Sequence, residues 1–439
     1  MSTGFFVSPG NSSVLRLPYS IRFLGVFAFL ALVSSITSLA QPALQNAVLN
    51  DQGFRERRLA RAQAFSDVEG VEVGSFKFGL SASYSLEFND NVNTTSTDPE
   101  GDIIQTPSLS LAISTPITDR SDLSLRFGVG YRAYWHNEDL SRITITPGSA
   151  IAYDIQIEDV FITVFDRMSY TEDVTTAPDL ANQAQFPRFD NTIGTQLTWI
   201  PDRFLVSAGY SYQTSLSTED QFNYYNKSSH LPFARAGYIF SQGAANAGLE
   251  FSVTFTDYEE NINQDSSIVS FGPYMDWQLS DAIQAGLRGG FLYTANSLTI
   301  LPEETFDANS YYFGLNVGHQ LTDYISQSIN INHGTRPSDQ QGAAFTEETS
   351  VSYGVSWAFI DPASIGLNFN YIHGDQTVAA GVTPSEIYDQ FRVGIGLSYA
   401  LAERLSGSLS YGYVVRDSDL PSRGYTQNRV TLGLSYRFR

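Results

Sequence analysis

The chain has 439 residues, no cysteine and a formal net charge of −21 at pH 7, and 16% of its residues are charged while 13% are aromatic. The lack of cysteine excludes a disulfide framework and a cysteine-ligated metal site. The negative balance argues against nucleic acid as a partner. Strand signals continue without a break from Phe76 to the C-terminus, so we predict one large all-β domain.

The first 40 residues have the features of a secretion signal peptide. Arg16 and Arg22 belong to a leader without acidic residues, and an apolar run occupies positions 23–33. This run is too short to span a bilayer as a helix. Small residues end the leader, which predicts cleavage between Ala40 and Gln41. Residues 41–75 are interpreted as a periplasmic N-terminal linker that precedes a barrel over 76–439.

From Phe76 onward, apolar side chains recur at alternate positions, which is the period of a β-strand. In the last segment Leu432 and Leu434 share one face, while Gly433 and Ser435 share the other. The segments are long and their polar face is rich in Gly, Ser, Asn and Arg, which is typical of a wall with lipid outside and water inside. We expect about 18 strands, with 16 as the alternative, beginning near residues 76, 103, 122, 142, 158, 188, 203, 229, 246, 267, 282, 309, 323, 348, 363, 388, 404 and 425.

The joints between these segments are alternately short and long. Short joints such as 118–120 and 361–362 contain a turn-favouring Asp or Pro, whereas long joints such as 171–187 and 334–347 are polar and acidic. This alternation predicts a transmembrane antiparallel up-and-down β-barrel with short periplasmic turns and long extracellular loops. A soluble lectin-like all-β protein is the alternative fold. The acidic long joints are interpreted as solvated loops.

The four tryptophans sort by strand end. Trp199, Trp277 and Trp357 lie near the short-joint ends of their segments, on the apolar face, and Trp135 lies at the opposite end. Indole rings at two levels of an apolar wall are typical of the interfacial girdles of a membrane barrel.

Two segments carry a resemblance to a known family. An aromatic strand over 84–92 ends in Asn-Asp-Asn-Val, and after a loop the segment 101–111 contains Asp-Ile and Pro-Ser-Leu-Ser-Leu. This pattern resembles a family of outer-membrane β-barrel porins, some of which are encoded beside exopolysaccharide clusters. The resemblance implies an outer-membrane barrel without catalytic residues. Tyr436 and Phe438 look like the aromatic C-terminal signal read by the barrel-assembly machinery, although Arg439 follows where the aromatic is usually last.

The polar face of the strands is expected to line a pore, and its ionisable residues include Arg126, Arg132, Arg235, Glu250, Arg288, Arg392 and Arg429. Arg235 and Glu250 are expected to lie opposite one another in a hairpin and to neutralise each other. Arg126, Arg288 and Arg392 have no acidic partner that can be assigned on adjacent strands, although acidic loops folded inward could supply one. Glycines between them leave room for larger neighbours or for a ligand path.

The function that these patterns indicate is a porin-like channel for passive diffusion of small hydrophilic solutes, with a preference for anions, in the outer membrane of a Gram-negative-type bacterium. The expected partners are outer-membrane lipid, the barrel-assembly machinery and small solutes, and oligomerisation is open. No nucleic acid, cofactor or metal is expected, and no enzymatic activity. The alternative function is an accessory barrel of exopolysaccharide export or surface anchoring, without an open pore.

Two signals for other chemistry are weaker. Among the histidines, His373 with Asp375 and His333 with Asp339 are the best candidates for a barrel hydrolase, but the chain has no Gly-x-Ser-x-Gly or His-Glu-x-x-His motif. Three carboxylates within 98–102 could hold Ca²⁺, but the downstream glutamate of a calcium loop is missing.

Overall fold

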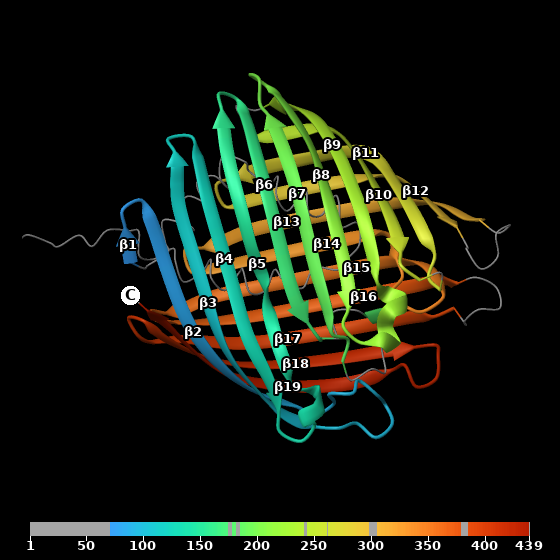
Figure 1. The fold of residues 1–439 in the computed structure, drawn as a ribbon. Helices are drawn as coiled ribbons and strands as arrows, with labels where there is room; N and C mark the ends of the chain where they lie inside the picture. The colour runs from blue at the N-terminus through green and yellow to red at the C-terminus, as the bar shows by residue number, and fades with distance from the viewer. Residues whose placement is uncertain are drawn as a thin grey trace, which may run out of the picture.

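The computed structural model describes residues 71–173, 178–180, 185–240, 244–260, 262–297, 305–378 and 385–438. The predicted signal peptide, with its cleavage site at Ala40 and Gln41, and most of the predicted linker lie outside these residues. The described chain is dominated by antiparallel strands that form one closed barrel (Figure 1).

The barrel contains 18 strands, β2 to β19, and each pairs with the next along the chain. β19 pairs with β2 from Arg429 opposite Asn89 to Phe438 opposite Leu80, and this pairing closes the sheet. The strands are β2 (Phe76–Asn89), β3 (Asp102–Thr118), β4 (Ser121–Tyr134), β5 (Arg142–Ile157), β6 (Val160–Thr171), β7 (Arg188–Trp199), β8 (Phe204–Ser217), β9 (Lys227–Phe240), β10 (Ala245–Tyr258), β11 (Asp265–Ser280), β12 (Ile283–Ser297), β13 (Thr305–Thr322), β14 (Ile325–Pro337), β15 (Ala343–Ile360), β16 (Ala363–Val378), β17 (Ile387–Ala402), β18 (Leu405–Ser418) and β19 (Tyr425–Phe438). The predicted fold class, a transmembrane antiparallel barrel of about 18 strands, is confirmed.

Four further elements are short. β1 (Val71–Val73) lies in the segment interpreted as linker and pairs with the start of β2. Turns of 3-10 helix, η2 (Glu138–Leu140), η4 (Pro178–Leu180) and η5 (Asp220–Tyr225), lie between strands. Within the described residues, no helix has the length and hydropathy needed to cross a membrane.

Most strands begin within a few residues of the positions expected from the sequence. The largest difference is at β15, which begins at Ala343 instead of near residue 348. β14 and β15 keep pairing up to Pro337 opposite Phe345, so Glu347 and Glu348 lie in a strand and not in a long solvated joint. Cross-strand pairing therefore continues through a polar segment that the apolar alternation does not mark.

The two ends of the barrel differ in their connections. At one end the strands are joined by tight turns, such as that between Thr118 and Ser121, and β1 and the C-terminus lie at this end (Figure 1). At the other end the connections are longer and include η2, η4 and η5. This is the arrangement expected for a barrel with periplasmic turns and extracellular loops.

The outer wall is apolar, which reverses the usual placement of hydrophobic side chains. In β17 and its neighbours Ile395 is 48% exposed, Leu409 49% and Leu432 54%. Trp199, Trp277 and Trp357 pair with residues at the tight-turn ends of adjacent strands, and Trp135 directly follows β4 at the other end; all four are exposed. The wall thus presents an apolar band between two levels of tryptophan, which is the surface that a bilayer covers.

A charge placed in this band is expected to destabilise the barrel. Replacing Ile395 with lysine should lower the free energy of unfolding by about 2–4 kcal/mol, because a lipid-facing lysine near the bilayer midplane loses its hydration. Ser398 lies on the opposite face of the same strand, and Ser398→Lys serves as the control with a much smaller effect. Denaturant unfolding of the two variants in lipid vesicles measures the difference; equal losses would place Ile395 outside the lipid-facing band.

Candidate functional site

The residues expected to line the pore all lie on the lumenal face of the wall. The pairing register places them opposite other inward-facing residues and on the face away from the exposed apolar side chains; they are Arg126, Arg132, Arg235, Glu250, Arg288, Arg392 and Arg429. Their positions follow from the two-residue period alone, since the side chains of a strand alternate between faces.

The connection between β6 and β7 folds into the barrel, and its root is fixed by buried ion pairs. Glu172 is 3% exposed, and its carboxylate lies 2.8 Å from Nε of Arg132 and 3.4 Å from Nε of Arg142. It also accepts a hydrogen bond of 2.9 Å from the hydroxyl of Tyr134. The next residue, Asp173, lies 3.2 Å from the guanidinium of Arg429 across the barrel seam. The first two residues after β6 are therefore held against β4, β5 and β19.

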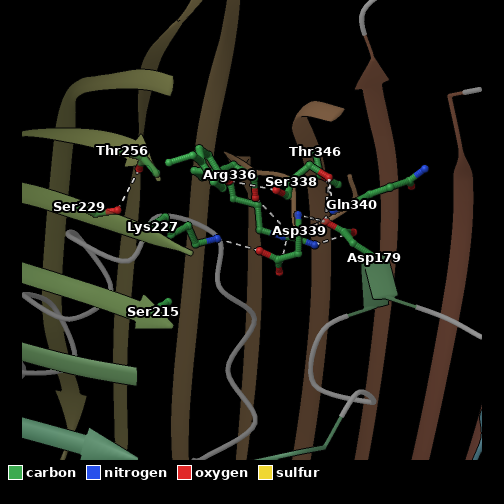
Figure 2. Close-up of polar contacts among 12 residues, drawn as sticks. Asp179, Ser215, Lys227, Ser229, Thr256, Arg336, Ser338, Asp339, Gln340 and Thr346 are labelled. Carbon is green, nitrogen blue, oxygen red and sulfur yellow. Dashed lines mark hydrogen bonds and ion pairs between the residues drawn. The ribbon is translucent and has the colours of Figure 1, made fainter. Parts of the chain in front are cut away.

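The described tip of this connection, η4, is held on a distant part of the wall. Asp179 is fully buried, and its carboxylate accepts hydrogen bonds of 2.7 and 2.8 Å from the two Nη atoms of Arg336 (Figure 2). The hydroxyl of Tyr388 donates at 3.0 Å and that of Thr346 at 3.2 Å. The backbone N–H of Asp339 donates at 3.1 Å. We name this contact between Asp179 and Arg336 the latch.

A second layer of ion pairs surrounds the latch. Arg336 also donates through Nε to Glu348 at 2.9 Å. Arg416 donates to the carbonyl of Pro178 at 3.1 Å and lies 2.7 Å from the carboxylate of Glu386, which Arg423 approaches to 2.9 Å. Charged groups that are this deeply buried are stabilised only as paired sets, since an unpaired buried charge is costly.

The position of the latch means that the chain crosses the lumen. The connection leaves the wall at β6 and β7, whereas Arg336 is on β14, Tyr388 is on β17 and Arg416 is on β18. In a ring of 18 strands these elements lie six to eight strands from β6 and β7, which is between a third and a half of the circumference. At the side of β7 to β9, Leu180 and Phe186 pack with Phe222 of η5. We call the described residues of this connection, 172–173, 178–180 and 185–187, the crossing segment. Its residues 178–180 contact both the β14 to β18 side and the β7 to β9 side of the barrel, and so they narrow the lumen there.

Two acidic residues of the crossing segment, Glu172 at its root and Asp179 at its tip, have pKa values that are shifted in opposite directions. Burial opposes the ionisation of Asp179, but the guanidinium of Arg336 and the hydrogen bonds to the carboxylate outweigh it, so the pKa of Asp179 lies well below its ordinary value of 3.8. Burial also raises the pKa of Glu172, and there the opposing charge of Arg132 is insufficient to offset it. The latch is therefore ionised at neutral pH.

Arg235 and Glu250 do lie directly opposite one another in the β9–β10 hairpin. The ion pair of Arg235 is nevertheless formed with Asp276 of β11, and its guanidinium lies over the ring of Tyr274, 3.3 Å from the centroid. Glu250 accepts a hydrogen bond of 3.2 Å from Tyr312. The expected direct neutralisation is thus replaced by a network that extends along the wall, because long side chains reach diagonal neighbours as well as opposite ones.

Three lumenal arginines have no carboxylate within 4.0 Å among the described residues: Arg126, Arg288 and Arg392. Arg126 is exposed to the lumen, Arg288 is half-buried and Arg392 is buried beside the amide of Gln390. With this amide oriented so that its oxygen faces Arg392, the oxygen accepts from the guanidinium at 2.8 and 2.9 Å. These three arginines are positive groups of the lumenal wall that no carboxylate of the described residues contacts, although Glu250 acts electrostatically on Arg288.

The histidines expected to mark a hydrolase are on the outer face of the wall. His333 lies 3.0 Å from Glu347, and His373 lies 3.0 Å from Asp389. Asp339 is beside the latch on the lumenal side, so the wall separates it from His333. The structure does not bring this pair together.

Of the carboxylates considered for calcium, that of Asp102 stabilises the start of the connection between β4 and β5. Asp102 accepts hydrogen bonds from the backbone N–H groups of Trp135, His136 and Asn137 at 3.0, 3.1 and 2.9 Å. Over the described ranges, no group of three or more histidine or acidic side chains converges in a way that could hold a metal ion.

The latch is the part of the site that sequence reasoning missed. Asp179 and Arg336 are 157 positions apart, and neither is marked by a local motif. The acidic connection over 171–187 reads as a solvated loop because it contains Glu172, Asp173 and Asp179 without an apolar period. A sequence signal that could have indicated the latch is Arg336, an arginine in a segment otherwise expected to be an external loop.

The comparisons with known proteins give fold-level similarities only. No protein-family model matches the chain, and no curated protein does. Among solved structures it is similar to Pseudomonas aeruginosa OccK2 (OpdF) in complex with glucuronate, with a TM-score of 0.47 and 13% identity over 84% of this chain and 100% of that one. It is also similar to a BenF-like porin from Pseudomonas fluorescens Pf-5, with a TM-score of 0.47 and 12% identity over 83% and 100% of the two chains. These TM-scores lie below 0.5, so the barrel's own residues carry the inferences that follow.

Proposed function

We propose that this protein is an outer-membrane channel through which small hydrophilic solutes diffuse passively. The observation that carries the proposal is the closed barrel of 18 strands, with an apolar band outside and a polar, charged lumen inside. A barrel of this size is wide enough to leave an aqueous path unless the lumen is filled. The crossing segment fixed by the latch then acts as a constriction that sets the size limit.

The charge of the wall supports a preference for anions. Arg126, Arg288 and Arg392 are lumenal and have no carboxylate within 4.0 Å among the described residues, whereas the acidic groups of the crossing segment are each matched by arginines. Arginine rings and tracks in a narrow pore favour negatively charged solutes. Selection is by size and charge, and no bond is made or broken.

Single-channel recording tests the proposal. The refolded protein in a planar bilayer with a KCl gradient should give stable open steps and a reversal potential on the chloride side. Open steps that favour potassium would retain the channel and contradict the anion preference. Well-folded barrels that remain silent would contradict the diffusion channel itself.

The latch should make the constriction insensitive to pH over the ordinary range. The pKa of Asp179 is depressed in the docked state, so its contribution is fully present above its ordinary value of 3.8 and is lost only as the pH falls through the lower, docked value. As far as the latch controls it, single-channel conductance should therefore stay constant from pH 8 to about pH 4 and rise only well below pH 4, as the pH approaches the docked pKa of Asp179. A conductance change centred near pH 6 would show that another group controls the crossing segment.

A further inference from the structure

Asparagines cluster on the lumenal face of β13 to β16, between the latch and the tight-turn ends of these strands. The register places side chains of β13 to β16 on one continuous inward surface, and its amides are Asn316, Asn330, Asn332, Asn368 and Asn370. Serines fill the positions between them, for example Ser350 opposite Asn332 and Ser352 opposite Asn330. We call this surface the amide wall.

Arginines border the amide wall on both sides. Along one row of the sheet, Asn316 is opposite Asn330, and the row ends at Asn370, which is opposite Arg392 of β17. On the other side, Arg288 of β12 is opposite Gly314 of β13. Two of the arginines without a carboxylate neighbour therefore lie at the edges of a surface of uncharged amides and hydroxyls.

Most of these amides keep hydrogen-bonding capacity free. Asn330, Asn332 and Asn368 are half-buried and have no hydrogen-bond partner among the residues that the structure describes. Asn370 donates to the hydroxyl of Ser352 at 2.8 Å, and its Oδ1 is buried with no partner there. The hydroxyl of Ser326, on the same face, is likewise buried without one. A wall amide offers two donors and an acceptor, so this surface can exchange water for other hydroxyl groups.

Glycines on the neighbouring strands fix where two amides lie. A Cβ at Gly394 would fall 2.6 Å from Oδ1 of Asn368, and one at Gly286 would fall 2.6 Å from Nδ2 of Asn316. Each amide therefore lies over the backbone of a residue that has no side chain. An alanine at either glycine would displace the amide, so the amide wall depends on these glycines for its shape.

We propose that the amide wall selects polyhydroxylated solutes, such as sugars and sugar acids, among the solutes that the channel admits. The hydroxyls of such a solute both donate and accept hydrogen bonds, so several of them can replace water at amides on adjacent strands, which lie about 4.8 Å apart. Arg288 and Arg392 attract a carboxylate at either edge. A solute of the same charge with an alkyl chain has no hydroxyl groups that could replace water at the amides. This inference rests on the proposed diffusion channel and names its substrate class.

The test compares two six-carbon anions of equal charge, gluconate and hexanoate, in the full-length channel. Their permeability ratio is obtained from reversal potentials with one salt on each side of the bilayer. The native channel should favour gluconate beyond the ratio of their mobilities in water. The variant Asn330→Ala, Asn332→Ala, Asn368→Ala should reduce this preference about two- to fivefold, in line with the modest net value of hydrogen bonds exposed to water.

Two further variants separate the amide wall from general effects. Asn309 is exposed on the outer face of β13, and Asn309→Ala should leave the ratio unchanged. Gly394→Ala keeps every amide but displaces Asn368, and it should lower the ratio part of the way; it also replaces the triple variant as the test if that protein does not fold. An open channel with the same ratio in all variants overturns this inference alone. A silent channel contradicts the proposed function instead.

Discussion

Replacing Asp179 with alanine is expected to raise the single-channel conductance about twofold and to make the open level noisy. The carboxylate makes six of the hydrogen bonds that hold the crossing segment on the far wall, to residues of β14, β15, β17 and the β14–β15 connection. Arg416 and Arg423 add only one hydrogen bond each, to the backbone carbonyls of Pro178 and Asp179. Its removal also leaves the buried guanidinium of Arg336 with one fewer partner, and breaking a buried pair costs about 3–5 kcal/mol. The segment should then leave the wall and enlarge the path.

Conductance at several KCl concentrations measures this effect, and the heat-dependent gel shift of folded barrels shows whether the variant is correctly assembled. Glu100, an exposed acid of the first long loop, provides the matched control, since Glu100→Ala removes one negative charge without touching the latch. An Asp179→Ala channel with the conductance and noise of the native one would mean that the crossing segment stays in place without the latch.

Charge reversal at the unpaired arginines is expected to reverse ion selectivity. In the double variant Arg288→Glu, Arg392→Glu, the wall loses two positive charges and gains two negative ones, at positions that no carboxylate of the described residues neutralises within 4.0 Å. The chloride-to-potassium permeability ratio should fall at least about fivefold in 0.1 M KCl. The effect should shrink in 1 M KCl, because the Debye length falls from about 10 Å to about 3 Å.

Reversal potentials in a KCl gradient give the ratio directly. Arg120→Glu makes the same change at one arginine, in an exposed turn between β3 and β4, and should alter the ratio only slightly. Arg392 is buried, so Arg126→Glu, at an exposed lumenal position, provides a variant whose folding is not at issue. Unchanged selectivity in all of these would remove the arginines from the ion path.

The barrel could be predicted closely because its signals are local. Two-residue alternation and tight turns are properties of short stretches, and they placed strand starts such as Phe76, Arg142, Arg188 and Tyr425 where the structure has them. The lumenal positions of the arginines followed from the same alternation. Where a strand is polar on both faces, as at the start of β15, the alternation gave no signal and the boundary was missed.

The interior arrangement could not be predicted for a different physical reason. A carboxylate such as Asp179 looks the same in a sequence whether it is solvated or buried against Arg336. The choice depends on which side chains the closed barrel brings to the opposite wall, and pairwise alternation contains no information about contacts across the lumen. The diagonal pairing of Arg235 with Asp276 was missed similarly, because side-chain reach, and not register, decides it.

The latch also constrains the order in which the protein is assembled. Asp179 belongs to the connection between the fifth and sixth of the 18 barrel strands, while its side-chain partners extend from Arg336 to Tyr388, and Arg423 donates to its backbone carbonyl. Contacts so far apart in sequence form late in folding, because the intervening chain must be ordered first. The latch is therefore expected to form only after β14 and β17 have joined the growing sheet, so the constriction is a late product of assembly and not a feature of the first strands to pair.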